Sequence, residues 1–341
     1  MINPIDFEGW NDLILQLNGY SFFHSKEWAK VLFESYKYEP VYFAIFENNE
    51  LCSVLPLMLV KSWLTGNRAV SLPFSDHCEP LSNSITHSDV LMKEAISFCE
   101  KKKMKYIEFR SSGTKFPFEA LAFRTDLQHS LRLNGNETEL FNHFSENTRR
   151  NIKKSTKYNL TLKTNNAYSG LKLFYKMHCH TRKRHGLPPQ PISFFNNIYK
   201  NIIMAGTGDI LFTANNTGYI AGAIYFKFGT KILYKFGASV SDSNELGGNY
   251  FVMWEAIKKY ISEGFKEFDF GRTEISHKGL QRFKCGWNTD ELLIYTTQYN
   301  IKEREYQSAS TKTDGIHNII FNHSPIFLLK LIGKSVYKHI G

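Results

Sequence analysis

Apolar and polar positions alternate along two stretches of the chain in the way that is typical of antiparallel strands. Residues 39–76 and residues 208–242 each hold three apolar runs separated by short polar turns. The first turn of each stretch, at 48–49 and at 215–218, is built from Asn, Thr and Gly, which favour tight hairpins. Each stretch therefore predicts three consecutive strands joined by turns.

Each predicted meander is followed by a segment with helical periodicity. Apolar residues recur every three or four positions over 89–103 and again over 248–264. Each of these helices leads into a short strand-like run, at 104–112 and at 265–273. Meander, helix and strand thus occur twice in the same order. This order predicts a duplicated α/β fold, with mixed, largely antiparallel sheets flanked by helices.

The segment between the two copies, residues 140–164, is helix-like and rich in basic residues. Its cations are Arg149, Arg150, Lys153, Lys154 and Lys157. Two interpretations stand side by side: a solvated helix face, or an electropositive arm that faces a polyanionic ligand. A further helix is predicted through His180, followed by a break at 186–189 and another helix from Ser193.

Composition limits the class of protein and of partner. A chain of 341 residues is long for one hydrophobic core, so two domains of roughly 150 residues each are expected. The 42 Lys and Arg residues exceed the 32 Asp and Glu residues, which gives a net charge of +10. This excess favours anionic partners such as phosphorylated substrates, a nucleotide-bearing donor, tRNA or an acidic membrane face, and does not choose among them.

Cysteine use and the N-terminal sequence predict a cytoplasmic protein. The five cysteines form no CxxC motif and no framework of close pairs, as expected of a reducing compartment. The first residues lack the features of a secretory signal, and no stretch holds the roughly 20 apolar residues of a spanning helix. His178 and His180 would point in different directions on a helix, so no metal site is predicted from them. No metal or redox cofactor is expected elsewhere.

A cation stands between Phe283 and the pair at 286–287, where the pattern predicts a strand restarting after the one that ends at Arg272. Lys284 is either a surface lysine beside an apolar plug or a site cation in a cleft where two strands separate. The second interpretation is preferred. It predicts that truncating this surface-cleft lysine stops the reaction and hardly moves the melting temperature. Cys285 is interpreted as a buried cysteine, because no histidine partner can be assigned to it.

Three other polar groups are candidates for a site. Arg272 closes a strand, where α/β folds present ligand groups; a salt bridge with Asp269 or Glu274 is the alternative. Asp76 or Glu79, in the loop after the first meander, is a candidate general base or amine anchor, and an ordinary loop carboxylate is the alternative. No Ser-His-Asp order or GxSxG motif is visible, which argues against a serine enzyme.

Taken in order, these features resemble the FemAB-like transferases of the GNAT superfamily and the related BioF2-like or CelD-like acyltransferases. The resemblance rests on Asp-Phe-Gly-Arg at 269–272, followed by Gly-Leu-x-x-Phe-Lys-x-Gly-Trp at 279–287. It includes Thr-x-x-Arg-x-Gly-Leu at 181–187, the basic run at 148–154, and His-Ser-x-x-Trp at 24–28. It covers about residues 20–300 and is closest to members associated with exopolysaccharide and exosortase gene clusters.

The resemblance implies transfer of an acyl or aminoacyl group to a primary amine of a cell-envelope glycan or peptide precursor. Acyl-CoA is the expected donor, and aminoacyl-tRNA, as in peptidoglycan-bridge enzymes, is the alternative. The implied partners are the envelope precursor, either a small molecule or a lipid-linked glycan, and tRNA. A non-catalytic glycan- or nucleic-acid-binding module with the same fold is the rival from another class.

Roles for single residues follow from the same motifs. Lys284 would stabilise the tetrahedral intermediate, with Asp76 as a further catalytic candidate. The implied substrate contacts are Arg184, which would bind a phosphate of the acceptor, Arg272, Phe283, Trp28 and Lys30. Family members often carry a lysine four residues after the tryptophan, where this chain has Leu32, so Lys30 is the nearby cation.

A helix N-terminus supplies the implied donor site. In GNAT enzymes the loop before the second long helix cradles the pyrophosphate of CoA. Of that pattern Gly247 is present here, with Gly248 and Asn249 after it. Glycines at a helix start let an anion approach backbone N–H groups. A tight turn and helix cap is the alternative.

The resemblance and the pattern divide the chain into three parts: an N-terminal GNAT-like domain (1–139), a C-terminal GNAT-like domain (140–300) and a basic amphipathic tail (301–341). In the tail, Pro325 predicts a helix start, and Lys330, Lys334 and Lys338 form a basic stripe beside apolar positions. This helix either packs on the first domain or lies on anionic lipid at the inner face of the membrane.

Overall fold

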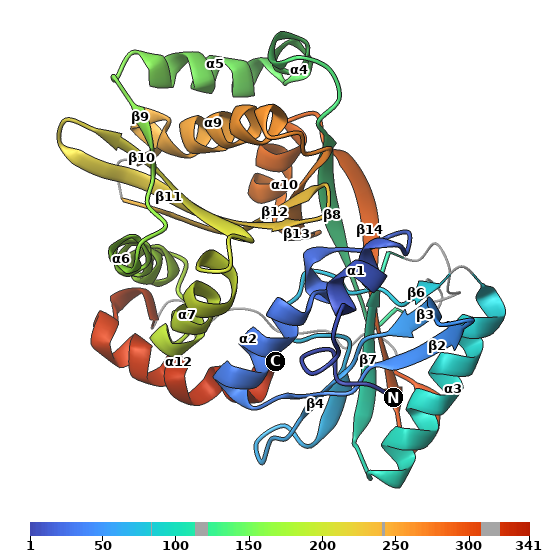
Figure 1. Ribbon diagram of the computed structural model, residues 1–341. Helices are drawn as coiled ribbons and strands as arrows, with labels where there is room; N and C mark the ends of the chain where they lie inside the picture. Colours follow the sequence, from blue (N-terminus) through green and yellow to red (C-terminus); the bar gives the residue numbers. More distant parts are fainter. Residues whose placement is uncertain (83, 113–121, 241–242, 308–320) are drawn as a thin grey trace. The chain divides into compact units, whose positions relative to one another are not determined.

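The chain forms two compact units in the computed structural model, which describes residues 1–82, 84–112, 122–240, 243–307 and 321–341 (Figure 1). Unit 1 comprises Met1–Leu127, Leu292–Lys312 and Ser335–Gly341. Unit 2 comprises Gln128–Glu291 and Thr313–Lys334. Part of the predicted tail, residues 308–320, lies outside the described residues.

Unit 1 contains the first predicted meander with its helix and strand. Its helices are α1 (Trp10–Leu15), α2 (Lys26–Tyr36), α3 (Ile85–Lys101) and the end of α12 (Ile326–Ile340). Its strands are β1 (Glu39–Pro40), β2 (Phe43–Glu47), β3 (Glu50–Leu55), β4 (Met58–Val60), β5 (Arg68–Val70), β6 (Leu81–Ser82), β7 (Tyr106–Ser111) and β15 (Glu305–Tyr306), with parts of β8 (Arg124–Arg132) and β14 (Asp290–Asn300).

The first stretch forms five short strands where the pattern predicts three. The hairpin at 48–49 is present between β2 and β3, and both asparagines have positive φ. Pro56 then interrupts the run, because proline has no N–H for a strand ladder. As a result β2, β3 and β6 form a small sheet, while β4 pairs antiparallel with β1 and β5. β7 then lies parallel to β5 and antiparallel to β14.

Unit 2 repeats this order with longer elements. Its helices are α4 (Glu137–His143), α5 (Glu146–Thr156), α6 (Tyr168–Arg184), α7 (Ile192–Ile198), α8 (Ser243–Leu246), α9 (Gly248–Ser262) and α10 (Lys278–Cys285), with a π-helix at Tyr199–Ile203. Its strands are β9 (Thr161–Thr164), β10 (Gly208–Asn215), β11 (Gly218–Phe228), β12 (Lys231–Ser239) and β13 (Glu267–Glu274). The second predicted meander is thus β10–β12, and the predicted α9 ends before Gly264, which has φ +84°.

The pairings in unit 2 explain how a site can open in its sheet. β9, β10, β11 and β12 pair antiparallel in succession, and β12 pairs parallel with β13. The parallel pairing covers only three positions, from Lys231↔Glu267 to Leu233↔Asp269, although both strands continue beyond it. The predicted α/β fold with mixed, largely antiparallel sheets and flanking helices is confirmed.

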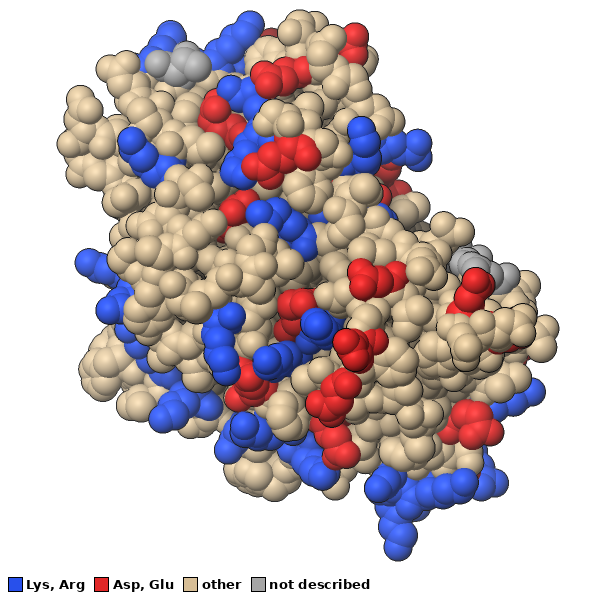
Figure 2. Space-filling view, in the orientation of Figure 1, with Lys and Arg blue, Asp and Glu red and all other residues tan. Residues whose placement is uncertain are grey.

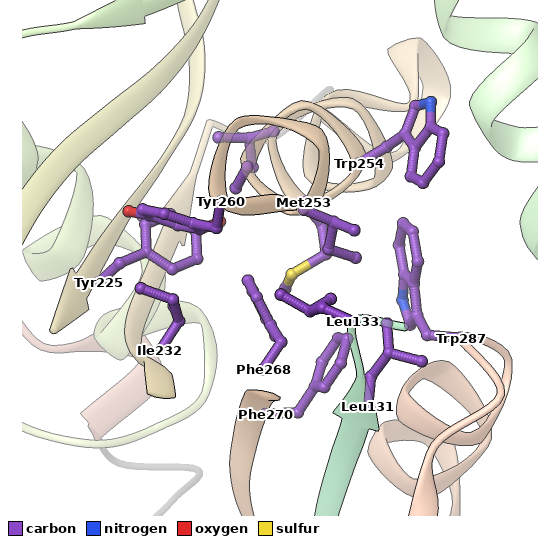
Figure 3. Close-up of a cluster of buried hydrophobic side chains, with 14 of the residues drawn as sticks. Leu131, Leu133, Tyr225, Ile232, Met253, Trp254, Tyr260, Phe268, Phe270 and Trp287 are labelled. Carbon is purple, nitrogen blue, oxygen red and sulfur yellow. The ribbon is translucent and has the colours of Figure 1, made fainter. Parts of the chain in front are cut away.

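The core of unit 2 lies between α9 and the sheet (Figure 3). Phe268 and Phe270 point from the strands toward Met253 of α9, and Tyr225 packs against Tyr260 of the same helix. α5 adds a further layer on α9. Phe144, just before α5, contacts Trp254 of α9 at a ring-centroid distance of 5.4 Å. The segment 140–164, predicted to be helix-like, contains the end of α4, α5 and the strand β9, with a break at Phe144-Ser145 where Ser145 caps α5.

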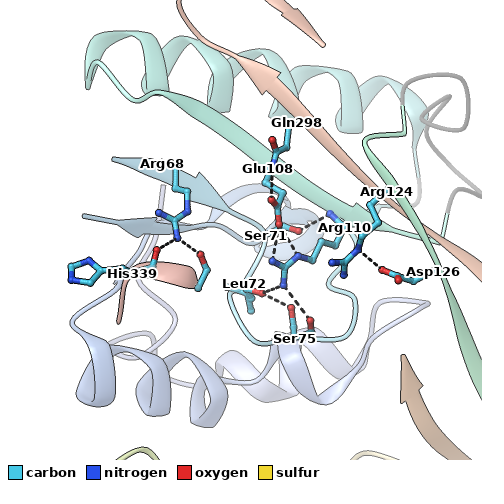
Figure 4. Close-up of polar contacts among 11 residues, drawn as sticks. Arg68, Ser71, Leu72, Ser75, Glu108, Arg110, Arg124, Asp126, Gln298 and His339 are labelled. Atoms are coloured by element: carbon cyan, nitrogen blue, oxygen red, sulfur yellow. Dashed lines mark hydrogen bonds and ion pairs between the residues drawn. The ribbon is translucent and has the colours of Figure 1, made fainter. Parts of the chain in front are cut away.

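A polar network in unit 1 holds the loop that follows β5 (Figure 4). Arg110 forms an ion pair of 2.7 Å with Glu108 and donates to the carbonyl oxygens of Leu72 and Ser75, both at 3.2 Å. Burial by itself would raise the pKa of the Glu108 carboxyl, but Arg110 and a hydrogen bond from Gln298 outweigh it, so that the pKa is lowered. Glu108 is therefore held as a carboxylate that anchors Arg110.

The end of α12 packs in unit 1 through polar contacts. The Tyr38 hydroxyl donates to the carbonyl of Tyr337 at 3.1 Å, and Arg68 donates to the carbonyls of His339 and Gly341. Tyr337 and His339 are buried. The packed interpretation is thus correct for residues 335–341. Among the described residues, no helix is both long and apolar enough to cross a membrane.

His178 lies buried on α6, and its neighbour His180 is exposed. The Nε2 atom of His178 lies 2.8 Å from Oε1 of Gln190. Burial, together with the charge of Arg182, lowers the pKa of His178 from 6.5 to about 3. His178 therefore stays neutral in the folded protein at pH values below about 6.5, at which the same side chain binds a proton in the unfolded chain.

Stability should accordingly fall as the pH decreases from 6.5 toward 3. We expect His178→Gln, which can still donate to Gln190, to lose less of its free energy of unfolding over this window. The difference from the wild type should approach about 1.4 kcal/mol per pH unit. Urea unfolding at several pH values measures it, with His180→Gln as the matched control. Parallel pH profiles for the wild type and His178→Gln would contradict the assignment.

Candidate functional site

Lys284 lies on a helix, not on a strand. His277 caps α10, because its Nδ1 accepts the backbone N–H of Leu280 at 3.1 Å, and the helix continues to Cys285. The expected strand restart at Phe283 is therefore wrong. The expectation of a surface-cleft lysine is also wrong, because Lys284 is only 3% exposed. Its truncation must therefore affect packing.

The ammonium group of Lys284 is positioned by the backbone of β13. Its Nζ donates to the carbonyl oxygens of Gly271 at 2.8 Å and of Arg272 at 3.0 Å. Gly271 has φ +71°, a backbone conformation that residues other than glycine rarely adopt. Its N–H donates to Asp269 at 2.7 Å, and Asp269 in turn accepts from Gln128 at 2.9 Å. The Asp-Phe-Gly-Arg motif thus forms a cradle for one buried cation.

Arg272 and Phe283 both lie beside this cradle. Arg272 is half-buried and gives its backbone carbonyl to Lys284. The ring of Phe283 contacts Tyr250 at 5.2 Å and Trp287 at 6.1 Å, so it fastens α10 to α9. These are structural contacts, and a substrate contact through either side chain stays a prediction.

The Gly-Trp pair after α10 has a packing explanation. A side chain at Gly286 would meet the Thr148 hydroxyl oxygen at 2.4 Å, so only glycine lets α5 approach this closely. The backbone N–H of Ser145 donates to the carbonyl of Gly286 at 2.9 Å. Trp287 is fully buried against Phe144, with ring centroids 5.1 Å apart. α5, α9 and α10 are therefore joined around this pair.

The Thr-x-x-Arg motif at 181–184 ties α6 to the end of β12. Thr181 accepts the backbone N–H of Ser239 at 3.0 Å, and one guanidinium nitrogen of Arg184 donates to the Ser239 carbonyl at 2.8 Å. The spacing of three places both side chains on one face of the helix. Gly186, with φ +64°, then ends α6, because its N–H returns to Lys183 and that of Leu187 to Arg182. Burial lowers the pKa of Arg184.

A cavity of about 870 Å³ opens beside Arg184 in unit 2. The described residues of its walls come from α6, β11, the end of β12 and residue 322. They combine basic side chains with apolar ones, and none of them is acidic. They are Leu173, Lys176, Met177, His180, Lys183, Arg184, Tyr219, Ser239, Val240 and Asn322. Such a lining suits an anionic group attached to an apolar or ring-shaped body. Arg184 and its motif were predicted; Ser239, 55 residues away, carries no signal in the sequence.

Gly247 and Gly248 lie buried at the start of α9. Gly247 has φ +70°, and a side chain on it would meet the backbone oxygen of Asn151 at 3.1 Å and Ser155 at 3.2 Å, both in α5. Asn249 is half-buried. α5 therefore covers one side of the helix start at which a pyrophosphate was expected, and donor binding by these three residues stays a prediction.

Trp28 and Lys30 lie on α2 in unit 1. Ser25 caps this helix by accepting the backbone N–H of Trp28 at 3.3 Å. Trp28 is fully buried with its ring 5.6 Å from that of Phe23, so the His-Ser-x-x-Trp motif is a helix start anchored in the core. Lys30 is half-buried, and Leu32, where the family lysine would stand, is fully buried.

Asp76 and Glu79 lie on a strained loop of unit 1. Leu72 and Phe74 have φ of +49° and +58°, which is costly for bulky residues and is common at functional sites. Arg110 and the His24 ring hold this loop; the ring lies 2.8 Å from the carbonyl of Glu79. Asp76 is half-buried. Asp76 belongs to unit 1 and Lys284 belongs to unit 2. A catalytic role for Asp76 stays a prediction.

The basic segment of unit 2 presents cations to solvent. Arg150, Lys153 and Lys157 are exposed on or just after α5. Figure 2 shows Lys and Arg side chains along the top of the view, where α5 lies in Figure 1. This exposure is required both of a solvated helix face and of an electropositive arm that faces a polyanionic ligand, so both interpretations remain.

The second copy matches a known family. Residues 142–284 match the model described as an acetyltransferase (GNAT) domain. This part of the chain is similar to a GNAT domain. The match begins before α5 and ends at Lys284 itself. It therefore includes the contact of Thr181 and Arg184 with Ser239, the start of α9 and the cradle formed by β13.

Comparison with individual proteins agrees with the FemAB-like resemblance. A lipid II:glycine glycyltransferase of Staphylococcus haemolyticus is 33% identical over 87 residues, a segment that is 24% of this chain and only 21% of that relative. The FemX crystal structure superposes with a TM-score of 0.69 at 16% identity and covers 86% of this chain and 95% of that one. L-PGS from Bacillus licheniformis gives 0.56 at 10% identity, with 98% of both chains covered. The resemblance to FemAB-like GNAT proteins is thus confirmed.

Proposed function

We propose that this protein transfers an aminoacyl group from an activated ester such as aminoacyl-tRNA to a primary amine of a lipid-linked cell-envelope precursor. One observation carries the acceptor class: the described residues that line the cavity beside Arg184 are partly basic and partly apolar, and none of them is acidic. A phosphate-bearing precursor has the matching chemistry. The relative named as a lipid II:glycine glycyltransferase supports the same class.

The proposed reaction is aminolysis of an ester. The neutral amine attacks the carbonyl carbon, and a C–N bond forms while the C–O bond to the donor breaks. The donor leaves as an alcohol and receives the proton that the amine gives up. Negative charge develops on the carbonyl oxygen in between. A fixed, water-poor cation such as Lys284 can stabilise it by several kcal/mol, because its position costs no rearrangement.

Two features favour an aminoacyl ester over acyl-CoA as donor. α5 packs against Gly247, which restricts the helix start where CoA pyrophosphate was expected. The exposed cations of α5 suit a long polyanion such as tRNA. Acyl-CoA is the second candidate, because residues 142–284 match the acetyltransferase model.

The donor is tested by offering radiolabelled glycyl-tRNA and radiolabelled acetyl-CoA separately, each with a lipid-linked precursor that has a free amine. We expect label in the lipid fraction from the tRNA ester. Label from acetyl-CoA alone would replace the proposal with the second candidate.

Arg184 should determine affinity for a phosphorylated acceptor. Replacing it with alanine removes charge-assisted hydrogen bonds of about 1.5–3 kcal/mol, so KM for the acceptor should rise about 10–100-fold. An acceptor analogue without phosphate should show almost no change. The control is Arg182→Ala, since Arg182 lies in the same helical turn but its Nε donates to the carbonyl of Pro188. Equal KM changes with both acceptors would remove the phosphate role from Arg184.

We also propose that α12 meets anionic lipid. Its exposed side chains are both apolar and basic: Phe327, Leu331, Lys330, Lys334 and Lys338. Deleting the helix would also remove the carbonyl partners of Arg68, so substitutions on the exposed face are the better test. Phe327→Glu with Leu331→Glu should abolish salt-sensitive flotation with anionic liposomes, whereas Met204→Glu, at another exposed apolar position, should not. Unchanged flotation in the double variant would contradict the contact.

A further inference from the structure

Three potential metal ligands converge in unit 2 outside the groups used above. They are His129 on β8, Cys285 at the end of α10, and Glu291 at the start of β14. A ring nitrogen, the sulfur and a carboxylate oxygen all lie within 4.8 Å of one another. Among the described residues this is the one such group of three. We propose that it binds a zinc ion.

The state of His129 is the strongest observation for a ligand. The residue is 0% exposed, and within the described part of the chain neither ring nitrogen has a hydrogen-bond partner. A buried polar group without a partner is costly and rare, and an unseen water or ion is one of its standard explanations. A hydrogen bond between the Cys285 thiol and Glu291 would occupy those two groups but leave both nitrogens of His129 unpaired.

The distance to Glu291 also fits a shared ion better than a hydrogen bond. Nδ1 of His129 lies 3.6 Å from Oε1 of Glu291, which is too long for a hydrogen bond. Two ligands of a tetrahedral zinc, each about 2.0–2.3 Å from the metal, lie about 3.5 Å apart. Small side-chain rotations would therefore bring the three atoms to zinc-binding positions.

The donor set and its surroundings suit zinc. Zinc accepts sulfur, imidazole nitrogen and carboxylate oxygen, and three protein ligands leave one position for water or another group. Glu291 is oriented by Gln281, whose Nε2 donates to it at 3.0 Å, as outer partners of metal ligands commonly do. The Glu291 side chain is 36% exposed, which gives an ion a route from solvent to the buried histidine.

An ion here would join β8, α10 and β14. Its ligand on α10, Cys285, is the residue directly after Lys284. Occupancy would stabilise the end of α10 and with it the ammonium cradle. The proposal does not depend on the donor or acceptor named above, since it concerns ion binding alone.

Binding is tested on the tag-free full chain. We expect isothermal titration to show one zinc ion per chain, and Co²⁺ to give a thiolate-to-metal charge-transfer absorption. His129→Gln and Glu291→Gln should each weaken zinc binding at least about tenfold. Loss of a residue that only orients a metal ligand already costs this much, so loss of a ligand should cost no less. Cys285→Ser should abolish the cobalt absorption. Glu291 is partly exposed, so its variant remains informative if a buried substitution prevents folding.

The matched control is a similar trio in unit 1. The Cys52 thiol donates to Glu47 at 3.6 Å, and Glu47 pairs with His87 at 3.3 Å. These ligand atoms do not converge as the first three do, so Cys52→Ser should leave zinc affinity and the cobalt absorption unchanged. An absence of zinc binding by the wild-type chain would overturn the proposal. So would equal affinity in wild type and Glu291→Gln, or loss of the cobalt absorption in Cys52→Ser alone.

Discussion

Replacing Lys284 with methionine is expected to lower the rate of transfer on the order of 100–1000-fold per folded molecule, the usual effect of removing one donor to a developing oxyanion. Methionine has a similar length and leaves no large cavity. The variant should also lose about 1–3 kcal/mol of unfolding free energy, because the buried carbonyl groups of Gly271 and Arg272 lose their donor. Both losses have one cause, the burial of a single ammonium group.

The measurement must separate chemistry from folding. Activity is divided by the fraction folded, taken from urea unfolding under the assay conditions. Lys278→Met is the matched control, since Lys278 is exposed at the other end of α10 and should change neither quantity. A Lys284→Met enzyme with wild-type kcat per folded molecule would leave Lys284 a purely structural role.

Trp287→Ala should cause the largest loss of stability, about 3–5 kcal/mol, as expected of a large aromatic side chain removed from a core. Trp287 is 0% exposed and contacts the rings of Phe144, Tyr250 and Phe283, which lie on or beside three helices of unit 2. Its removal would leave a cavity beside the cradle of Lys284. Catalysis should therefore fall together with stability.

Urea unfolding monitored by circular dichroism measures this loss. The matched control is Trp63→Ala in unit 1, because Trp63 is 84% exposed and should change the unfolding free energy by no more than about 0.5 kcal/mol. Equal losses for the two tryptophans would contradict the packing around α10.

Local periodicity and turn chemistry were enough to predict much of unit 2. The meander β10–β12 and the helix α9, with Gly264 after it, follow from rules that act over a few residues. Helix caps were a signal that went unused. Asn136 with Glu139 forms a capping box, and Ser145 caps α5, so the division of the basic segment could have been predicted.

α10 was missed because a buried lysine breaks the binary pattern. Leu280, Lys284 and Trp287 follow helical spacing, but a lysine counts as polar until its carbonyl partners are known. Those partners lie on β13, 12 and 13 residues earlier. The clamp between Arg184 and Ser239, and the trio around His129, likewise depend on contacts across long stretches of sequence. No local pattern predicts such contacts.

The central claim is that an aminoacyl group is joined to an amine of a lipid-linked precursor. Mass spectrometry of the precursor after incubation with the protein and aminoacyl-tRNA tests this most directly. The account predicts a product heavier by one amino-acid residue, attached through a new amide, and almost none with Lys284→Met. An unchanged precursor with wild-type protein at every aminoacyl-tRNA offered, or a gain of an acetyl group from acetyl-CoA instead, would contradict it.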